Sequence, residues 1–113
     1  MKSKILALSK NEEFKNLLKK KKISNKYITI FFGYLDNKDN KKLNISFVTK
    51  KKLGNAVKRN KIKRRLKNIM NDAIKKIPIN LNYSYLVIAK STMLNNEFKK
   101  IKETLFQEFK KIK

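Results

Sequence analysis

Apolar side chains recur at helical spacing just past the middle of the chain. The positions that share one helical face are Ile62, Leu66, Ile69, Met70, Ala73 and Ile74. Pro78 disfavours helical backbone at the residue before it, so a helix cannot continue far beyond Lys76. The pattern therefore predicts one long amphipathic helix over residues 56–76.

A shorter amphipathic pattern lies near the N-terminus. Residues 9–12 read Ser-Lys-Asn-Glu, which fits a capping box at the start of a helix. A narrow apolar stripe follows at Phe14, Leu17 and Leu18. We predict a helix over residues 10–21.

The C-terminal segment carries the third helical pattern. Asn95 or Asn96 can cap this helix, and Glu97 is favourable near its N-terminus. The apolar positions, three and four residues apart, are Phe98, Ile101, Leu105, Phe109 and Ile112. This stripe is typical of a helix that packs on a core.

Two segments alternate between apolar and polar positions, as half-buried strands do. They cover residues 27–34 and 43–49, and a turn-forming cluster at residues 36–40 separates them. In the first segment, the side chains expected to share a face are Tyr27, Thr29 and Phe31. We predict that the two segments pair as antiparallel neighbours.

A continuous apolar run over residues 83–89 differs from these alternating segments. Such a run is typical of a central strand that is buried on both faces. Because the run follows a helix, we expect a parallel neighbour beside it in the sheet.

Charge changes the interpretation more than any other property. The 113 residues include 31 Lys or Arg and 8 Asp or Glu, so the net charge is +23. Twelve cations and no acid stand between Asp39 and Asp72, and this interval holds all three Arg residues. A solvated helix face normally carries acids as partners for its bases, so the interval indicates a nucleic-acid-binding surface.

Other classes of site are excluded or disfavoured by composition. The chain has no Cys and no His, which rules out disulfides, thiolate zinc sites and His-based catalysis. Its two Gly residues cannot make a phosphate-binding glycine-rich loop, and its acids are scattered. No apolar run approaches the roughly 20 residues that span a bilayer. We expect a cytoplasmic protein with one RNA-binding domain over residues 1–113.

The basic segment is where the sequence becomes recognisable. Residues 49–66, which read TKKKLGNAVKRNKIKRRL, resemble the signature of the bacterial ribonuclease P protein component. The positions that match with their spacing kept are Gly54, Ala56, Val57, Arg59, Asn60, Lys63 and Arg64. The chain departs from the family at Lys61 and Lys67, where Arg is usual, and at Leu18, where an aromatic residue is usual.

The resemblance implies a fold and a function. The fold would be α+β: a single small α/β sandwich of αβββαβα order, with a mixed sheet and a left-handed βαβ crossover, similar to ribosomal RNA-binding proteins. The chain would be the protein subunit of ribonuclease P, the endonuclease that removes the 5′ leader of precursor tRNA. The catalyst would be the partner RNA, which requires Mg²⁺; the chain would have no catalytic residue and bind no metal or cofactor.

The resemblance also implies two sets of binding residues. The set expected on the catalytic RNA is Lys50, Lys51, Lys52, Lys58, Arg59, Asn60, Lys61, Lys63, Arg64, Arg65 and Lys67. The set expected in a cleft for the 5′ leader of precursor tRNA is Phe14, Leu18, Tyr27 and Phe31. Arg59 falls within the apolar arc of its predicted helix, so it either overhangs the sheet or is partly buried with a partner.

Two alternatives stay open at this point. A ribosomal or other structural RNA-binding protein would share the size, charge and fold. A DNA-binding protein that is indifferent to sequence would share the charge. The expected partners are the catalytic RNA and precursor tRNA, with no membrane, and an oligomer of holoenzymes is compatible with them.

Overall fold

The computed structural model describes residues 5–8, 11–35, 41–94 and 97–112, which form one mixed sheet of five strands and three helices. The strands are β1 (Ile5–Leu6), β2 (Lys21–Ser24), β3 (Ile28–Gly33), β4 (Leu43–Val48) and β5 (Ser84–Ala89). The helices are α1 (Asn11–Leu18), α2 (Ala56–Lys76) and α3 (Phe98–Lys111), with short 3-10 turns η1 (Lys51–Leu53) and η2 (Ser91–Leu94). From α1 onward the order is αβββαβα, as expected.

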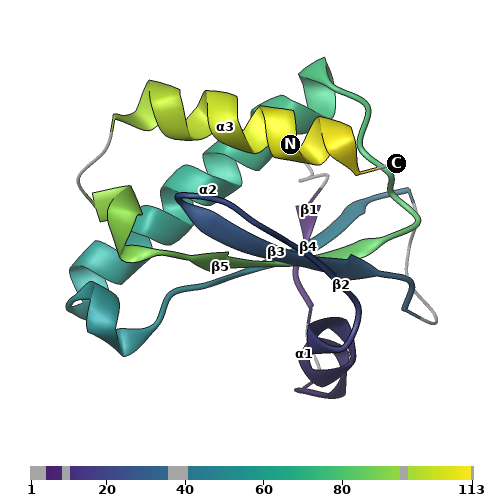
Figure 1. The fold of residues 1–113 in the computed structure, drawn as a ribbon, viewed down its shortest axis with the longest axis horizontal. Helices are drawn as coiled ribbons and strands as arrows, with labels where there is room; N and C mark the ends of the chain where they lie inside the picture. Colours follow the sequence, from purple (N-terminus) through teal and green to yellow (C-terminus); the bar gives the residue numbers. More distant parts are fainter. Residues whose placement is uncertain (1–4, 9–10, 36–40, 95–96, 113) are drawn as a thin grey trace.

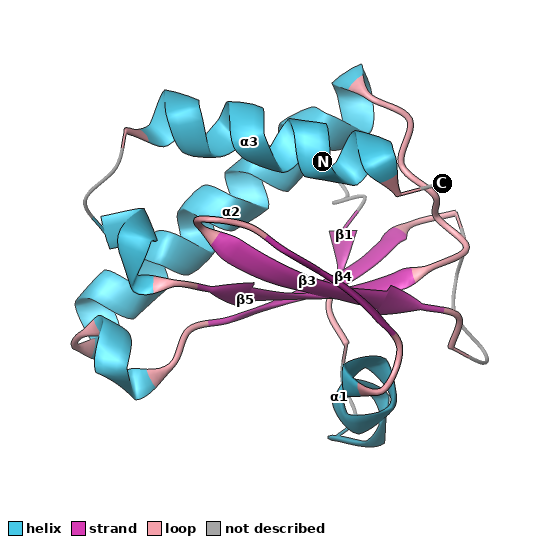
Figure 2. Ribbon diagram, in the orientation of Figure 1, coloured by secondary structure: helices cyan, strands magenta, loops and turns pink. Residues whose placement is uncertain are grey.

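The helices lie in two layers around the sheet. Figure 1 shows α2 and α3 together over one face of the sheet and α1 alone on the other. The strand order is β1-β4-β5-β3-β2, so β5 is central, and it is parallel to β4 and antiparallel to β3 (Figure 2). The prediction of a buried central strand with a parallel neighbour is confirmed.

The predicted antiparallel pairing of the segments 27–34 and 43–49 is wrong. Both segments are strands, but β5 lies between them and pairs with each. Two amphipathic strands that are consecutive in the chain do pair in many proteins. Here β5, whose residues after Ser84 are mostly apolar, occupies the central position that is buried on both faces. It therefore separates β3 from β4.

The N-terminal part of the fold contains two short strands that hydrophobic patterning did not predict. The helix expected over residues 10–21 ends at Leu18, and Lys21 already belongs to β2, which pairs with β3. Strand β1 has only two residues and lies parallel to β4. Such short edge strands owe their conformation to backbone hydrogen bonds with a neighbour, which leave no periodic trace in the sequence.

Some expected features lie outside the described residues. They are the first two positions of the capping box, the turn cluster at residues 36–40 and the caps at Asn95 and Asn96. In the structure, the residue that precedes α3 is Glu97, whose side chain makes no capping hydrogen bond.

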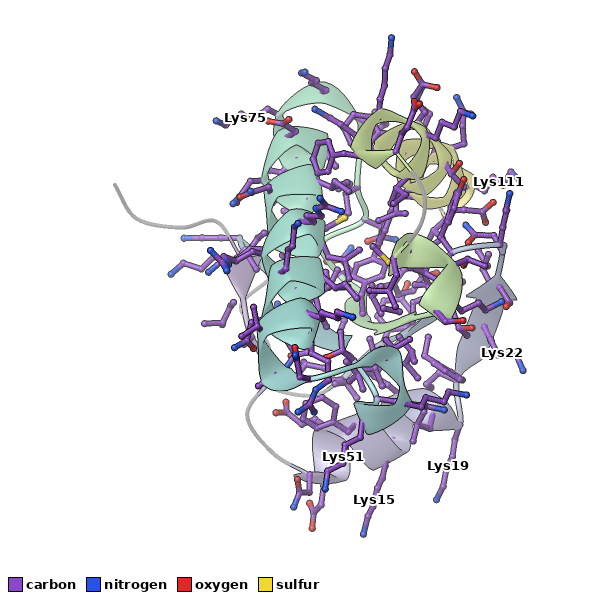
Figure 3. The ribbon with its side chains drawn as sticks, turned by 90° about the vertical axis from the view of Figure 1, so that its left-hand side faces the viewer. Lys15, Lys19, Lys22, Lys51, Lys75 and Lys111 are labelled. Carbon is purple, nitrogen blue, oxygen red and sulfur yellow. The ribbon has the colours of Figure 1, made fainter. Side chains whose placement is uncertain are left out.

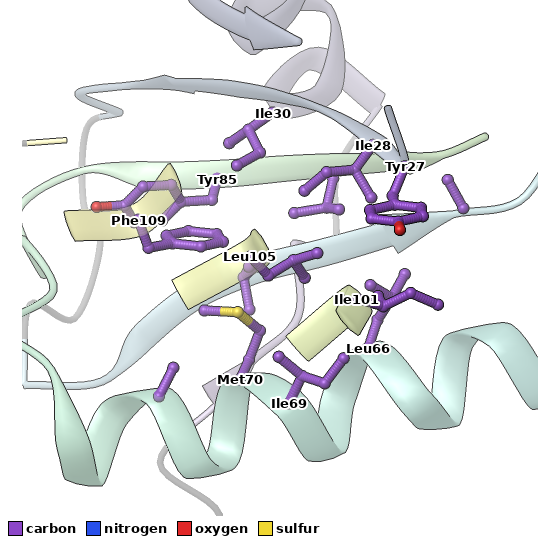
Figure 4. Packing of buried hydrophobic residues seen from close by; sticks show 14 of the residues in the cluster. Tyr27, Ile28, Ile30, Leu66, Ile69, Met70, Tyr85, Ile101, Leu105 and Phe109 are labelled. Carbon is purple, nitrogen blue, oxygen red and sulfur yellow. The ribbon is translucent and has the colours of Figure 1, made fainter. Parts of the chain in front are cut away.

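The main core fills the space between the sheet and the layer of α2 and α3 (Figure 4). In its centre, the rings of Tyr85 and Phe109 lie 5.4 Å apart between centroids. Helix α2 contributes the fully buried Leu66, Ile69 and Met70. Burial of each such side chain contributes about 1.5–3 kcal/mol, so this face holds α2 against the sheet.

A smaller apolar cluster joins α1 to the opposite face of the sheet. Its buried members are Leu8, Leu17 and Leu86, and the partly buried Phe14 and Phe31 pack against them. The polar faces of α1 and α2 are consequently turned to solvent on different sides of the molecule.

Candidate nucleic-acid interface

The candidate interface begins in the basic connection between β4 and α2. Leu53 is 2% exposed and packs into the main core, whereas Lys50, Lys51 and Lys52 are exposed. The amide of Leu53 donates to the carbonyl of Lys50 at 3.0 Å, which closes the turn η1. One apolar anchor therefore holds the turn while its three ammonium groups reach into solvent.

Gly54 and Asn55 determine how this connection enters α2. Gly54 has φ 131°, and a Cβ added there would lie 2.9 Å from Cδ of Lys58. The Asn55 side chain accepts a hydrogen bond from the Lys58 amide at 3.0 Å and caps the helix. The first turn of α2 contains no acid, so the positive end of the helix dipole adds to the cationic character of the segment.

Helix α2 matches the predicted bounds 56–76 and separates two kinds of side chain. Its buried face consists of Ile62, Leu66, Ile69, Met70 and Ala73. Of the eleven residues predicted to bind the catalytic RNA, nine are exposed and two, Arg59 and Arg65, are half-buried. The structure thus brings all eleven together on the segment from Lys50 to Lys67, which comprises η1 and the first half of α2.

Arg59 is partly buried, which is one of the two arrangements considered from the sequence, but its Nε lacks the partner expected there among the described residues. Its backbone amide donates to the Asn55 carbonyl at 3.1 Å, as in a regular helix. A buried guanidinium nitrogen without a hydrogen-bond partner is unusual in a folded protein, and the described residues supply no acceptor for it.

The cations of this segment have no acidic partners. Within the part of the chain that the structure describes, no residue from Lys50 to Lys67 forms an ion pair. Two ion pairs of the described residues lie elsewhere, between Asp72 and Lys102 and between Glu108 and Lys111. The hydrogen bond and charge of Lys102 lower the pKa of the Asp72 carboxyl, so the first acid that follows the segment in the sequence is paired with a lysine of α3. Figure 3 shows lysines of several elements extending outward from the fold.

A groove runs along the part of β4 that β1 does not cover. Strand β1 pairs only with Leu43 and Asn44, so the following β4 residues form a sheet edge. The groove has a volume of about 270 Å³, and its lining includes Phe14 of α1, Val48 of β4 and Lys67 of α2. It therefore connects a predicted leader residue with a predicted RNA-binding residue.

The four residues predicted for the leader cleft divide into three groups. Phe14 and Phe31 lie together in the smaller cluster between α1 and the sheet. Leu18 lies on the same helix as Phe14 but is 48% exposed. Tyr27 is 5% exposed and belongs to the main core on the opposite face of the sheet.

The prediction that Tyr27 shares a face with Phe31 is therefore wrong. Figure 4 shows the Tyr27 ring on the helix side of the sheet, near Leu66 and Ile101. The reason is local: the Asn25 side chain accepts hydrogen bonds from the amides of Tyr27 and Ile28, at 2.8 and 2.9 Å. This turn precedes β3, which begins at Ile28, so the alternation of the strand does not extend back to Tyr27.

Sequence reasoning did not select Ser46 and Val48, which also line the groove. They lie on the face of β4 opposite to Leu43, Ile45 and Phe47, which pack in or against the main core. The Ser46 hydroxyl accepts a hydrogen bond from the Leu8 amide at 2.8 Å, which ties the chain after β1 to this edge. Ser46 and Val48 could have been identified from the sequence as the alternate positions of this strand, on the face away from the main core.

The described residues contain no cluster of three or more His, Cys, Asp or Glu side chains that could hold a metal ion. Among the same residues, no helix is both long and apolar enough to cross a membrane. The exposed cations next to the groove at Phe14 suit recognition of an anion.

Comparisons with known proteins identify the family of this chain and support its fold. A family model described as "Ribonuclease P" matches residues 3–113. The ribonuclease P protein component of Carboxydothermus hydrogenoformans is 36% identical over 110 residues, covering 94% of this chain and 90% of the relative. Among solved structures, the RNase P protein of Staphylococcus aureus matches with a TM-score of 0.77 and 26% identity, covering 94% of this chain and 93% of that chain. The RNase P protein of Thermotoga maritima, at 24% identity, supports the fold with a TM-score of 0.80 over 96% of this chain and 98% of that one. This chain belongs to the family of ribonuclease P protein components.

Proposed function

We propose that the chain acts as the protein component of ribonuclease P and takes part in endonucleolytic removal of the 5′ leader from precursor tRNA. The observation that carries this proposal is the continuity of the cationic surface with the groove that contains Phe14. Lys67 borders both, so one surface can hold a folded RNA while the groove takes a single strand that emerges from it.

The catalytic RNA subunit would bind the surface formed by η1 and the first half of α2. Lysines and arginines attract phosphates at long range, and the guanidinium groups of Arg64 and Arg65 can each grip a phosphate with two hydrogen bonds. The absence of ion pairs within this segment supports the assignment, because every cation keeps its full charge for a partner. Arg59, which is half-buried, adds its positive charge to this surface.

The leader of precursor tRNA would lie in the groove along the edge of β4. Phe14 offers an aromatic ring on which an unpaired base can stack, and Lys67 offers a charge for the adjoining phosphate. Phe31 supports Phe14 from within the smaller cluster, and Leu18 extends the apolar surface of α1 toward solvent. Tyr27 has no part in this site, because it belongs to the core on the other face.

The chemical step would belong to the RNA. The scattered acids of this chain leave hydrolysis to Mg²⁺ ions bound by the partner RNA, so the chain would bind and orient the substrate. In this proposal the protein binds no cofactor of its own and works in the cytoplasm.

Reconstitution tests the proposal directly. The chain is added to the bare catalytic RNA of ribonuclease P at low Mg²⁺, and cleavage of a precursor tRNA at the 5′ end of the mature sequence is measured. We expect the chain to stimulate cleavage strongly and the complex to bind leader-bearing precursor more tightly than leaderless tRNA. A chain that binds the RNA but gives no stimulation would be a structural RNA-binding protein instead. Competition with duplex DNA at fixed salt identifies a general DNA-binding protein, since affinities depend steeply on salt.

A further inference from the structure

A pair of tyrosines stands at the end of the sheet, next to α1. Tyr34 directly follows β3. Its side chain is 63% exposed, more than that of any other described tyrosine or phenylalanine. Its ring lies 4.7 Å from that of Tyr83, centroid to centroid, with 59° between the ring planes. Tyr83 in turn lies 5.5 Å from the buried ring of Phe32. The exposed ring is therefore supported from below by rings that belong to the core.

Cationic side chains surround the exposed tyrosine. A pocket of about 340 Å³ is lined by Asn16, Lys19 and Lys20 at the end of α1, together with Tyr34 and Leu35. This lining contains two ammonium groups and no acid. Lys21 lies close enough to Tyr34 to influence the pKa of its hydroxyl.

The stem of Lys20 is held in position against the backbone of β3. A Cβ added at Gly33 would lie 2.8 Å from Cγ and 2.9 Å from Cβ of Lys20, so the two are in close contact. The first carbons of this side chain are therefore fixed, while the amino group at its end is exposed. Gly33 is the residue that permits this approach, because any larger side chain would displace Lys20.

This surface is separate from the basic segment already described. In the register of the sheet, Gly33 pairs with Ser84, whereas Ile28, at the other end of β3, pairs with Ala89. Lys50 follows β4 at that second end, since Val48 pairs with Ile88. The five steps from Ile28 to Gly33, at about 3.3 Å each, place roughly 17 Å between the two ends.

We propose that this surface, which we call the tyrosine subsite, binds a nucleotide of single-stranded RNA. Its residues are Tyr34, Tyr83, Lys19, Lys20 and Lys21. The Tyr34 ring stacks on one unpaired base, and the lysines hold the phosphates on either side. The identity of the RNA strand rests on the proposed function. A precursor-tRNA leader that is long enough to extend beyond the groove at Phe14 is the single-stranded RNA that would reach the tyrosine subsite.

The hydroxyl of Tyr34 is compatible with such a ligand. Its hydrogen bond with Tyr83 raises the pKa of the Tyr34 hydroxyl above its ordinary value. A tyrosine is already protonated in the neutral range at its ordinary pKa, and the upward shift moves deprotonation further from it, so the ring carries no negative charge that would repel a phosphate.

The experiment measures how affinity depends on leader length. Holoenzymes reconstituted with the wild-type chain, Tyr34→Ala, Tyr34→Phe and Lys20→Ala bind precursor tRNAs whose leaders run from about 4 to about 16 nucleotides, the range of site sizes of small single-strand-binding domains. Lys110→Ala is the matched control, because Lys110 is an exposed lysine on α3. Melting temperatures of the four variants establish that each is folded.

We expect Tyr34→Ala to weaken binding of the long leaders by about fivefold, the effect of losing one modest stacking contact. Short leaders should bind unchanged, and Tyr34→Phe should retain the wild-type affinity because it keeps the ring. Lys20→Ala should show the same length dependence, and Lys110→Ala should show none. Equal affinity of Tyr34→Ala and wild type for every leader would overturn the subsite. An equal loss at every length would do so as well, because it would place Tyr34 on the catalytic RNA or in the fold.

The two proposals fail in different ways. If the wild-type chain does not stimulate the catalytic RNA, the proposed function is wrong. The subsite is then tested with the free protein and a fluorescent single-stranded RNA oligonucleotide, where Tyr34→Ala must still weaken binding relative to Tyr34→Phe. If wild-type stimulation is normal and the length dependence is absent, only the subsite is wrong.

Discussion

Phe14 of α1 and Lys67 of α2 line the same groove, although 52 positions separate them in the sequence and they come from opposite layers of the fold. The edge of β4 is what allows them to meet, because β1 covers only its first two residues. This relationship makes the leader groove and the RNA-binding helix one continuous surface.

The first prediction concerns the aromatic ring in that groove. Phe14→Leu should keep most of the apolar packing under α1 and remove the surface on which a base stacks. We expect the preference of the holoenzyme for leader-bearing precursor over leaderless tRNA to fall by about fivefold or more. Measuring both dissociation constants at one salt concentration checks this.

Phe106→Leu is the control for that variant. Phe106 is also half-buried, but it packs against the main core from α3. Both variants should lower stability to a similar extent, and only Phe14→Leu should change the leader preference. A preference lost in both would indicate a general effect of stability.

Arg64→Ala tests the cationic surface. Arg64 is exposed and forms no ion pair, so we expect an unchanged melting temperature and weaker binding of the catalytic RNA. The slope of log affinity against log salt should become shallower by about 0.7–0.9, as the loss of one phosphate contact predicts. Titrations at several salt concentrations measure the slope, with Lys110→Ala as the control. An unchanged slope with lower stability would assign Arg64 a structural role.

Tyr27→Ala should behave as a core substitution. The ring is buried among the side chains under α2 and α3, so its removal leaves a cavity and should lower the free energy of unfolding by about 3 kcal/mol or more. Denaturant unfolding measures this loss. The preference for leader-bearing over leaderless tRNA, per folded molecule, should stay at the wild-type value. A changed preference with unchanged stability would show that Tyr27 contributes to leader binding.

Gly54→Ala should be more harmful than loss of the neighbouring helix cap. At φ 131° and ψ −166° the backbone is in a region that is almost confined to glycine, and the new Cβ would press on Lys58. We expect a loss of about 1–3 kcal/mol, against about 1 kcal/mol for Asn55→Ala, which removes the cap. Gly54→Asn should give no rescue, because Asn tolerates only the ordinary left-handed region. Thermal and denaturant unfolding of the three variants provide the comparison.

Asp72→Asn tests the link between α2 and α3 through its dependence on pH. Because Lys102 lowers the pKa of Asp72 in the folded chain, the pair stabilises the fold above the ordinary pKa of an Asp carboxyl. This contribution is lost as pH falls through the lowered, folded-state pKa. The melting temperature of the wild type should be slightly higher than that of Asp72→Asn at neutral pH, and the two should be equal in acid. Glu103→Gln changes an exposed residue of α3 and is the control, for which no pH-dependent difference from the wild type is expected. A difference that persists in acid would mean that the amide disturbs packing.

Features that depend on local chemistry could be predicted well. The apolar period and Pro78 predicted α2, and the structure has the predicted bounds. The uniform apolar character of β5 predicted its central place. The cationic segment was also visible, because charge and spacing along one helix are properties of the sequence.

The sequence by itself therefore determined the principal elements and the residues of the cationic surface, since these depend on neighbours within one or two helical turns. Only the tertiary structure decided the strand order, the two short strands β1 and β2, and the face on which Tyr27 lies. The groove between Phe14 and Lys67 belongs to this second group. The physical reason is that backbone hydrogen bonds between strands join residues far apart in the chain without regard to their side chains, so a periodic pattern shows that a strand exists and not which strand lies beside it.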